Sequence, residues 1–381
     1  MTLDLGRLSA AIRAMGEHLA AQQAAYEQRV ALARALLRTV EPAALVAAVE
    51  AGHATALPLE PPAARYPPPA PPTDYQVLAT DGSQIEPDRH GPALWYLLNI
   101  GWAVIQYGAT PWAELASTPQ LYYRPEDLYV RDGARQAPIQ GSRLDARRSV
   151  AELERLAALA ARPAPVPRVA LSDGFLLLWA YWEGPEGFVR DHFVEQFQQA
   201  LCRLQQLAVP VAGYISRPRG ADIVMLLRQA PPHRRACGRC RGTEPEAPCA
   251  LDGLVDRLLF DDLAPGERSA LFESRTLARY YPPELLPRFF YLNVGREVAR
   301  VELPAWAAAQ PDLVARVHAV VVDQCRRGQG YPVVLARAHE QAVVGGADRQ
   351  RVEELIRQTL VVHGLPDRPS AKQASKLVRA V

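Results

Sequence analysis

Apolar and polar positions divide the chain into a helical start, a proline-rich stretch and a long region of alternating strands and helices. In residues 2–50, apolar residues recur at about every third or fourth position, which is the spacing of one helix face. Prolines crowd residues 57–73, and proline excludes both a helix and a central strand because it lacks an N–H and fixes φ. We therefore predict an N-terminal helical arm in residues 1–56 and a stiff linker in residues 57–73.

After the linker, short apolar runs predict strands, and longer stretches with helical spacing predict helices. The predicted strands are residues 75–80, 93–107, 120–124, 127–130, 168–172, 209–216, 256–260, 288–293, 298–303 and 333–335. The predicted helices are residues 144–161, 188–207, 221–229, 311–328, 338–344, 348–360 and 370–379. This alternation predicts an α/β fold with a mixed sheet flanked by helices. The main domain is expected in residues 74–345 and C-terminal helices in residues 346–381.

Two predicted strands end in an Asp–Gly pair, at Asp81 and at Asp173. Two such strands can bring both carboxylates to one edge of a sheet. Carboxylates held close together repel unless a cation lies between them, so this pattern predicts a divalent metal site. Asp–Gly is also a common turn pair, and a plain turn remains an alternative at each position.

Three further residues are candidates for the same site. Glu152 lies at the edge of the apolar stripe of a predicted helix, whereas Glu154 lies nearly opposite, because successive residues turn by about 100°. Tyr331 lies at the approach to the predicted strand 333–335, and His339 lies at the opening of the helix that follows. Histidine can bind a metal or hold a proton near neutral pH, and tyrosine can bind a phosphate oxygen or a water. A solvated glutamate and a structural histidine and tyrosine are the alternatives.

Composition narrows the class of protein. Hydrophobic residues make up 49% of the 381 residues, which is enough for a sizeable core, and no apolar run reaches the ~18–20 residues that span a bilayer. The first residues lack the basic-then-apolar layout of a signal peptide, so we expect a cytoplasmic protein. The net charge is only +2, and lysine occurs only at Lys372 and Lys376, so high arginine content alone does not indicate nucleic-acid binding.

The positions of individual arginines are more informative than their number. Arg217 and Arg219 follow a predicted strand, and Arg268 and Arg279 lie in a charged connection. Guanidinium groups near strand ends suit phosphate, so these four are candidate DNA contacts. Solvated surface arginine is the alternative for each of them.

Residues 230–252 are basic, rich in glycine and proline, and contain three of the five cysteines. The spacing His233-x3-Cys237-x2-Cys240-x8-Cys249 is typical of zinc ligands, and a metal would order a loop that otherwise has nothing to hold it. An iron–sulfur cluster, free thiols and an occasional disulfide are the alternatives. We predict a structural zinc within an insertion of the main domain.

Five segments in order resemble the NurA nuclease family. They are Asp81-Gly-Ser, Ser172-Asp173-Gly, Gly213-Tyr-Ile-Ser-Arg-Pro, the charged stretch 256–273, and Gly330-Tyr-Pro with Ala338-His339-Glu. The resemblance implies a ribonuclease H-like core that binds Mn2+ (or Mg2+) and cuts DNA, with 5′→3′ exonuclease and single-strand endonuclease activity. It further implies a homodimer that works with the hexameric HerA translocase in DNA end resection and double-strand break repair.

By position, the resemblance makes Asp81, Glu152 and Asp173 the acidic metal site, with His339 as a further ligand and Tyr331 completing it. Glu86 is the alternative third acid. Two other readings of the same residues stay open: another acidic-site nuclease of the RNase or resolvase type, and an inactive scaffold for DNA or an ATPase partner.

Overall fold

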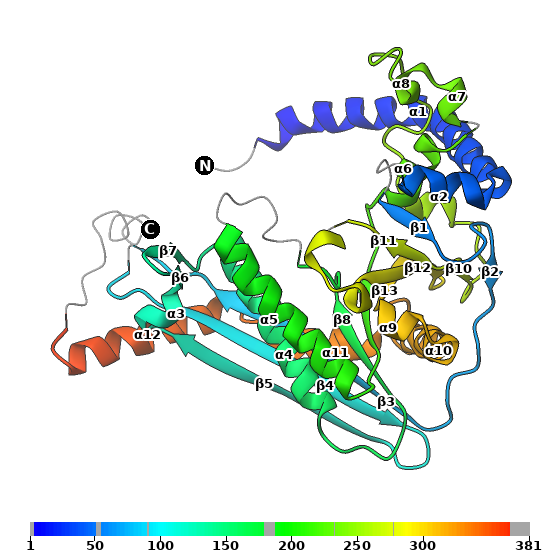
Figure 1. Ribbon diagram of the computed structural model, residues 1–381. Helices are drawn as coiled ribbons and strands as arrows, with labels where there is room; N and C mark the ends of the chain where they lie inside the picture. The colour runs from blue at the N-terminus through cyan, green and yellow to red at the C-terminus, as the bar shows by residue number, and fades with distance from the viewer. Residues whose placement is uncertain are drawn as a thin grey trace. The chain divides into compact units, whose positions relative to one another are not determined.

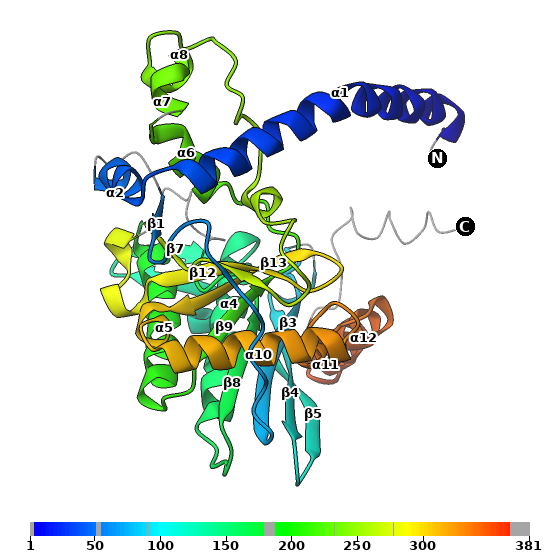
Figure 2. The same ribbon diagram turned by 90° about the vertical axis from the view of Figure 1, so that its right-hand side faces the viewer.

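The computed structural model describes residues 4–50, 55–89, 91–178, 187–231, 233–276 and 278–365 (Figures 1 and 2). The chain divides into two compact units. Unit 1 comprises residues 1–67, 217–278 and 288–300, and unit 2 comprises residues 68–216, 279–287 and 301–381. The N-terminal helices thus share a unit with segments from the middle of the chain. No helix among the described residues is long and apolar enough to cross a membrane.

Unit 2 is built on a five-stranded mixed sheet in the order β5-β4-β3-β8-β9. Its strands are β3 (Tyr75–Ile85), β4 (Tyr96–Tyr107), β5 (Trp112–Tyr122), β8 (Arg168–Asp173) and β9 (Val211–Ile215). The first three form an antiparallel meander, and β8 and β9 continue it in parallel with β3. Strand β4 is buried along nearly its whole length and β3 from Tyr75 to Thr80, as their apolar runs require, whereas residues 81–84 of β3 are half-buried.

Helices cover both faces of this sheet. Helix α4 (Ser142–Ala160) links β5 to β8, and α5 (Gly187–Gln206) links β8 to β9. Thr80 of β3 bonds to α4, whereas the next residue, Asp81, contacts α11 (Val333–Ala342), so the two helices pack on opposite faces (Figure 1). A three-stranded meander extended by two parallel strands, with helical crossovers, is the ribonuclease H-like arrangement. The predicted fold class is confirmed.

Shorter and C-terminal elements complete unit 2. They are α3 (Pro125–Leu128), β6 (Tyr129–Asp132), β7 (Arg135–Pro138), η4 (Pro283–Leu285), α9 (Ala305–Ala308), α10 (Pro311–Arg327) and α12 (Gly346–Val362). The turn η3 (Ala278–Tyr280) lies at the boundary between the units, and β13 (Val298–Pro304) belongs to unit 1 as far as Arg300.

Unit 1 packs helices onto a set of short antiparallel strands. Its helices and 3-10 turns are α1 (Leu5–Thr39), α2 (Pro42–Glu50), α6 (Asp222–Gln229), α7 (His233–Ala236), α8 (Gly238–Arg241) and η2 (Asp256–Leu259). Its strands are β1 (Ala56–Pro58), β2 (Arg65–Tyr66), β10 (Arg268–Ser269), β11 (Phe272–Ser274) and β12 (Pro287–Asn293), of which Pro287 falls in unit 2. From Val30 onward helix α1 buries one face, Val30, Ala33 and Leu37, in the core of this unit.

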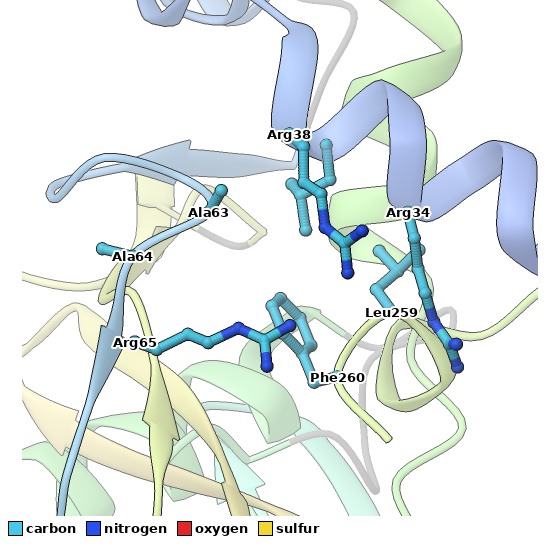
Figure 3. A pocket seen from close by; sticks show the side chains of 8 residues that line it. Arg34, Arg38, Ala63, Ala64, Arg65, Leu259 and Phe260 are labelled. Atoms are coloured by element: carbon cyan, nitrogen blue, oxygen red, sulfur yellow. The ribbon is translucent and has the colours of Figure 1, made fainter. Parts of the chain in front are cut away.

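A small pocket in unit 1 shows how α1 is held (Figure 3). Arg38 and Arg65 both reach the Asp262 carboxylate, at 2.7 and 2.6 Å, and Arg34 pairs with Asp261. The arginines that line this pocket are therefore ion-paired to acids, and they fasten α1 to the segment that follows η2.

Several predicted elements were wrong in kind. Residues 256–260 form the 3-10 turn η2, because the Asp256 side chain accepts the Ile223 and Val224 amides at the start of α6. Residues 333–335 begin a helix, in which Val334 and Leu335 are buried one turn before Ala338.

Other predictions differ in extent. Strand β5 begins well before the predicted start at residue 120, and α3 replaces the start of the predicted strand 127–130. The proline-rich stretch contributes two short strands, β1 and β2, that pair with β11 and β10. The predicted helix 370–379 lies outside the described residues.

Candidate active site

Asp81 and Asp173 lie side by side on parallel strands. Thr80 and Ser172 are register partners in β3 and β8, so the residues after them come at the same level and on the same face of the sheet. Asp173 ends its strand, and Gly174 turns the chain away at φ +110°. Asp81 does not end a strand: β3 continues in unbroken register with β4 to Ile85, so the predicted turn at Asp81–Gly82 is wrong.

The Asp81 carboxylate is fixed by two contacts. One oxygen accepts the Gly82 amide at 2.8 Å, and the other lies 2.6 Å from Nδ1 of His339. The Asp81 side chain is 19% exposed and that of His339 is 68% exposed. The imidazole therefore touches the acid on one side and faces solvent with much of the rest of its ring.

Gly101 explains how His339 comes so close. Gly101 is the register partner of Asp81 in β4, and a Cβ at that position would lie 2.6 Å from the Ala338 carbonyl and overlap the Ala342 amide. Helix α11 thus rests directly on the backbone of β4. The Asn99 amide anchors its end by donating to the Gln341 and Ala342 carbonyls at 3.1 and 2.9 Å. His339 lies in the second turn of α11, not at the opening of a helix as predicted.

Glu152 approaches from the opposite helix, α4, across a second glycine. A Cβ at Gly82 would overlap Oε1 of Glu152 and lie 2.7 Å from Cγ of Arg148. Arg148 pairs with Glu152 at 3.3 Å and donates to Gln84 at 3.1 Å. The pKa of Glu152 is raised to about 8, chiefly by burial; the Asp81 and Asp173 carboxylates add to the rise, and Arg148 opposes it. The three acids therefore interact as one group.

Tyr331 completes the group on the side of Asp173. Its phenol donates a hydrogen bond to the Asp173 carboxylate, and its ring packs edge-on against the buried Tyr214 ring at 5.4 Å. Burial raises the pKa of Asp173, which the Tyr331 hydrogen bond opposes, and burial beside Asp173 raises the pKa of Tyr331. The phenol thus stays protonated at neutral pH and acts as a donor.

The structure brings the five predicted site residues, Asp81, Glu152, Asp173, Tyr331 and His339, to one place. Glu154 pairs with Arg147 at 3.7 Å, away from the acids, as the helical spacing predicts. Glu86 is engaged by the Gln84 side chain and by the Gly141 amide, at 2.8 and 3.2 Å. The pKa of Glu152 responds to both aspartates, so the geometry favours Glu152 over Glu86 as the third acid.

The four predicted DNA-binding arginines differ in exposure. Arg217 and Arg279 are exposed, as is Arg219. Arg268 is buried: it donates to both Glu60 oxygens, at 2.8 and 3.1 Å, and stacks 3.8 Å above the centre of the Tyr66 ring. Arg268 holds unit 1 together and does not fit the predicted DNA contact.

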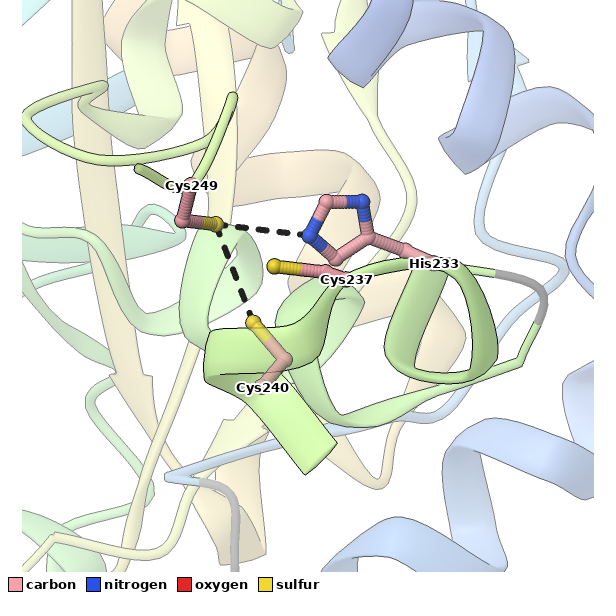
Figure 4. A group of neighbouring side chains, drawn as sticks. All are labelled: His233, Cys237, Cys240 and Cys249. Atoms are coloured by element: carbon pink, nitrogen blue, oxygen red, sulfur yellow. Dashed lines mark hydrogen bonds between the residues drawn. The ribbon is translucent and has the colours of Figure 1, made fainter. Parts of the chain in front are cut away.

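The predicted zinc ligands also come together, in unit 1 (Figure 4). One ligand atom from each of His233, Cys237, Cys240 and Cys249 lies within 4.8 Å of all the others. Among the residues that the structure describes, this is the only cluster of histidine, cysteine or acidic side chains that meets this spacing. The possible ligand atoms around Asp81 are spaced more widely than those of this cluster.

Sequence reasoning missed Arg148 and the two glycines that admit the helices. Arg148 gave no signal, because a helical arginine four residues before a glutamate is usually a surface ion pair. Gly101 did give one: an isolated glycine inside a long apolar strand indicates a close approach of another backbone.

A ribonuclease H-like sheet that carries two acids on neighbouring strands, with a third acid, a histidine and a tyrosine brought to them by α4 and the α11 segment, is typical of acid-centred phosphodiester hydrolases. A sequence model of the NurA domain matches residues 75–344, which is more than half of the chain. The chain therefore belongs to the NurA family, a family of nucleases.

Solved structures give distant similarities. A crystal structure of NurA is 10% identical, with a TM-score of 0.40, and the match covers 76% of this chain and 90% of that chain. A NurA structure bound to dAMP and manganese is 11% identical, with a TM-score of 0.33 and coverages of 75% and 88%. LC9-RNase H1, a type 1 RNase H with the type 2 active-site motif, is 15% identical, with a TM-score of 0.21 and coverages of 42% and 71%. No curated protein sequence matches the chain.

Proposed function

We propose that this protein is a metal-dependent deoxyribonuclease that hydrolyses phosphodiester bonds at the group formed by Asp81, Glu152 and Asp173. The observation that carries the proposal is the electrostatic coupling of these three acids beside His339 and Tyr331. A single buried acid could be structural, but three carboxylates gathered beside a histidine and a tyrosine repel one another unless a cation lies between them.

The residues fit a hard divalent cation such as Mn2+ or Mg2+. Carboxylate oxygens and an imidazole are ligands that these ions accept, and a cation would offset both the burial and the neighbouring carboxylates that raise the pKa of Glu152. Asp81 and Asp173 would hold the ion from neighbouring strands, with Glu152 completing the set. When bound, such a metal supplies hydroxide near neutral pH and stabilises charge on the leaving oxygen.

The chain's own residues position and protonate the substrate. Nδ1 of His339 contacts the Asp81 carboxylate, which leaves Nε2 able to hold or deliver a proton. Such a proton could be delivered to the leaving oxygen when a DNA strand is cut. Tyr331, kept protonated by its raised pKa, donates to Asp173 and can orient a phosphate oxygen or a water. Arg148 neutralises part of the charge on Glu152.

We further propose the finer activities that family membership suggests: 5′→3′ exonuclease and single-strand endonuclease cleavage in DNA end resection and double-strand break repair. Manganese is the proposed metal, because one similar NurA structure is bound to dAMP and manganese. Exposed Arg217, Arg219 and Arg279 are the proposed contacts to the DNA backbone.

Partners are proposed on the same grounds: a second copy of this chain and a HerA-type hexameric translocase. Exposed apolar surfaces support a protein partner. Five residues of α1 at alternating three- and four-residue spacing are 40–68% exposed, namely Leu5, Leu8, Ile12, Met15 and Leu19. This is the seam of a helix that pairs with another helix.

We also propose a cytoplasmic location, because free cysteines fit a reducing compartment.

The proposal is tested by incubating purified protein with manganese and labelled DNA or RNA strands of one sequence, alongside Asp81→Ala. We expect cleavage of DNA by the wild type and none by the variant, with unchanged folding by circular dichroism. Cleavage of RNA alone would favour an RNase, and full activity of Asp81→Ala would refute the site. If the pure protein is inactive, adding the translocase separates a partner-dependent nuclease from an inactive scaffold.

A further inference from the structure

We propose that His233, Cys237, Cys240 and Cys249 bind one Zn2+ ion. The ion would hold the α7–α8 segment against residues 249–254, on which helix α1 packs. This site lies in unit 1 and takes no part in the proposed hydrolysis. Its support is the geometry of the four ligand atoms, the charge around them and the small amount of side-chain burial in the α7–α8 segment.

The distances between ligand atoms match a tetrahedral zinc site. Nε2 of His233 lies 3.4 Å from Sγ of Cys249, which lies 3.7 Å from Sγ of Cys240 (Figure 4). With Zn–S near 2.3 Å and Zn–N near 2.0–2.1 Å, a regular tetrahedron has edges of about 3.6 Å between nitrogen and sulfur and about 3.8 Å between sulfurs. These two distances are therefore close to two edges of such a tetrahedron, and all four ligand atoms lie within 4.8 Å of one another.

Local structure explains why three ligands converge. His233 and Cys237 are one helical turn apart, and the Cys237 amide donates to the His233 carbonyl at 2.9 Å. Cys240 follows as the third residue of α8, and its sulfur lies within 4.8 Å of the ligand atoms of His233 and Cys237. Gly242, at φ +80°, then ends α8 and returns the chain toward Cys249, the fourth ligand.

The surrounding charge suits a bound thiolate group. Three thiolates, a neutral imidazole and Zn2+ carry a net charge of −1. Arg228 hydrogen bonds Cys240 and pairs with Asp252 at 3.0 Å, which fixes a positive charge beside the sulfurs. A cation that hydrogen bonds a ligand from outside is the usual support of a metal site, whereas an apolar disulfide has no need of one.

The segment has little else to order it. Helices α7 and α8 are four residues each, and α8 buries none of its side chains. Cys249, by contrast, belongs with Leu251 and Leu254 to the core cluster of unit 1. A metal shared between Cys249 and the α7–α8 ligands therefore joins a weakly packed segment to a well-packed one.

The consequence reaches helix α1. Arg29 of α1 donates to the carbonyl of Ala250 at 2.9 Å and to that of Asp252, directly after the fourth ligand. Val30 and Ala33 pack in the same core cluster as Cys249. We expect loss of the metal to weaken these contacts between α1 and the segment after Cys249. Hydrogen exchange should then increase in residues 26–37 and 249–254.

The test is the zinc content of the full chain, purified under reducing conditions and measured by mass spectrometry of the metal. The proposal predicts about one zinc per chain in the wild type. It predicts loss of that zinc in Cys249→Ser and retention in Cys202→Ser, a cysteine outside the cluster. Asp81→Ala should also retain it, which distinguishes this site from the acidic group.

Two further measurements keep the proposal testable if Cys249→Ser does not fold. Cobalt added to the zinc-stripped wild type should give the strong near-ultraviolet absorption of thiolate ligands and the visible bands of tetrahedral cobalt. His233→Cys should retain zinc, because four cysteines also form a structural site. No metal in the reduced wild type, a Cys240–Cys249 disulfide that zinc does not prevent, or zinc unaffected by Cys249→Ser would each overturn the proposal.

Discussion

Two glycines bring charged and titratable side chains to Asp81. Gly82 follows it in the same strand and makes room for Glu152 and Arg148 from α4, and Gly101 faces it across β4 and makes room for α11. Neither has a positive φ, so backbone freedom is not their purpose. Each glycine instead leaves room for a helix to pack closely against its strand, α4 at Gly82 and α11 at Gly101.

Gly82→Ala should therefore lower activity by displacing Glu152. The added methyl overlaps the Glu152 carboxylate and the Arg148 side chain, both of which can move aside. We expect cleavage to fall by about 100-fold, since misplacing a catalytic group by 1 Å can cost that much. The free energy of unfolding should change by less than about 1.5 kcal/mol, because flexible side chains yield more cheaply than backbone.

The matched control is Gly346→Ala, where a methyl group meets nothing within 4 Å. Cleavage rates and urea denaturation curves of the two variants would be compared with those of the wild type. Equal activity of Gly82→Ala and Gly346→Ala would show that the position of Glu152 does not matter.

His339→Ala should lower the cleavage rate without lowering stability. The His339 side chain is 68% exposed, so its removal leaves no cavity, and we expect the unfolding free energy to change by less than about 0.5 kcal/mol. Loss of a residue that transfers a proton costs about 10²–10⁴-fold in rate. The control is Glu340→Ala, its exposed neighbour on α11, and similar rates for both variants would remove His339 from the site.

The sequence predicted that three acids lie near one another, because each placement depends on a simple rule. Asp81 and Asp173 come directly after the apolar runs of two predicted strands, although β3 continues past Asp81 to Ile85, and Glu152 follows from helical spacing. His339 was placed in the right site for the wrong reason, since residues 333–335 are helical. Arg148 and the burial of Arg268 could not be predicted, because both depend on partners far away in the sequence.

At the scale of elements, the packing of α11 on β4 positions the proton-handling side of the site. Most predicted strands and helices of unit 2 were correct, because the strand pattern is continuous and the helices are long. The short run Val333–Leu335 was ambiguous, because three apolar residues fit a strand or a helix equally well. Tertiary contacts decided it: the buried Gln324 side chain accepts the Val334 amide at 3.1 Å.

Gly101→Ala should disturb this packing more than Gly82→Ala disturbs the opposite face. The new methyl would meet the backbone of α11, including the Ala338 carbonyl at 2.6 Å, and backbone cannot rotate away. We expect a loss of about 1–3 kcal/mol in unfolding free energy. Cleavage should fall as well, since His339 moves with α11. Urea denaturation gives the first quantity, and a variant as stable as the wild type would contradict the close packing.

At the scale of the molecule, the catalytic group lies in unit 2, and unit 1 has its own core and its own buried acid. Asp256 is fully buried and accepts the Ile223 and Val224 amides and the Tyr291 hydroxyl. Burial, with the nearby Asp222 carboxylate, raises the pKa of Asp256 to about 7 from an ordinary value of 3.8. The sequence suggested a strand here and gave no sign of this acid's role.

The raised pKa of Asp256 predicts a pH dependence of stability. The folded chain holds this proton more tightly than the unfolded chain does, so the group's contribution is fully present below about pH 4 and is lost as the pH rises through about 7. Asp256→Asn stays neutral and lacks this loss. The wild type should therefore lose stability relative to Asp256→Asn between pH 4 and 7 in urea denaturation. Parallel curves would contradict the shift.

The central claim is that Asp81, Glu152 and Asp173 form one metal-dependent nuclease centre. The most direct test is the cleavage rate of a 5′-labelled single-stranded DNA with manganese, magnesium or EDTA, for the wild type and for Asp173→Ala. Glu154→Ala, which removes an acid from the outer side of α4, is the control. We predict metal-dependent cleavage that Asp173→Ala loses and Glu154→Ala keeps. Undiminished cleavage by Asp173→Ala, or cleavage that persists in EDTA, would contradict the claim.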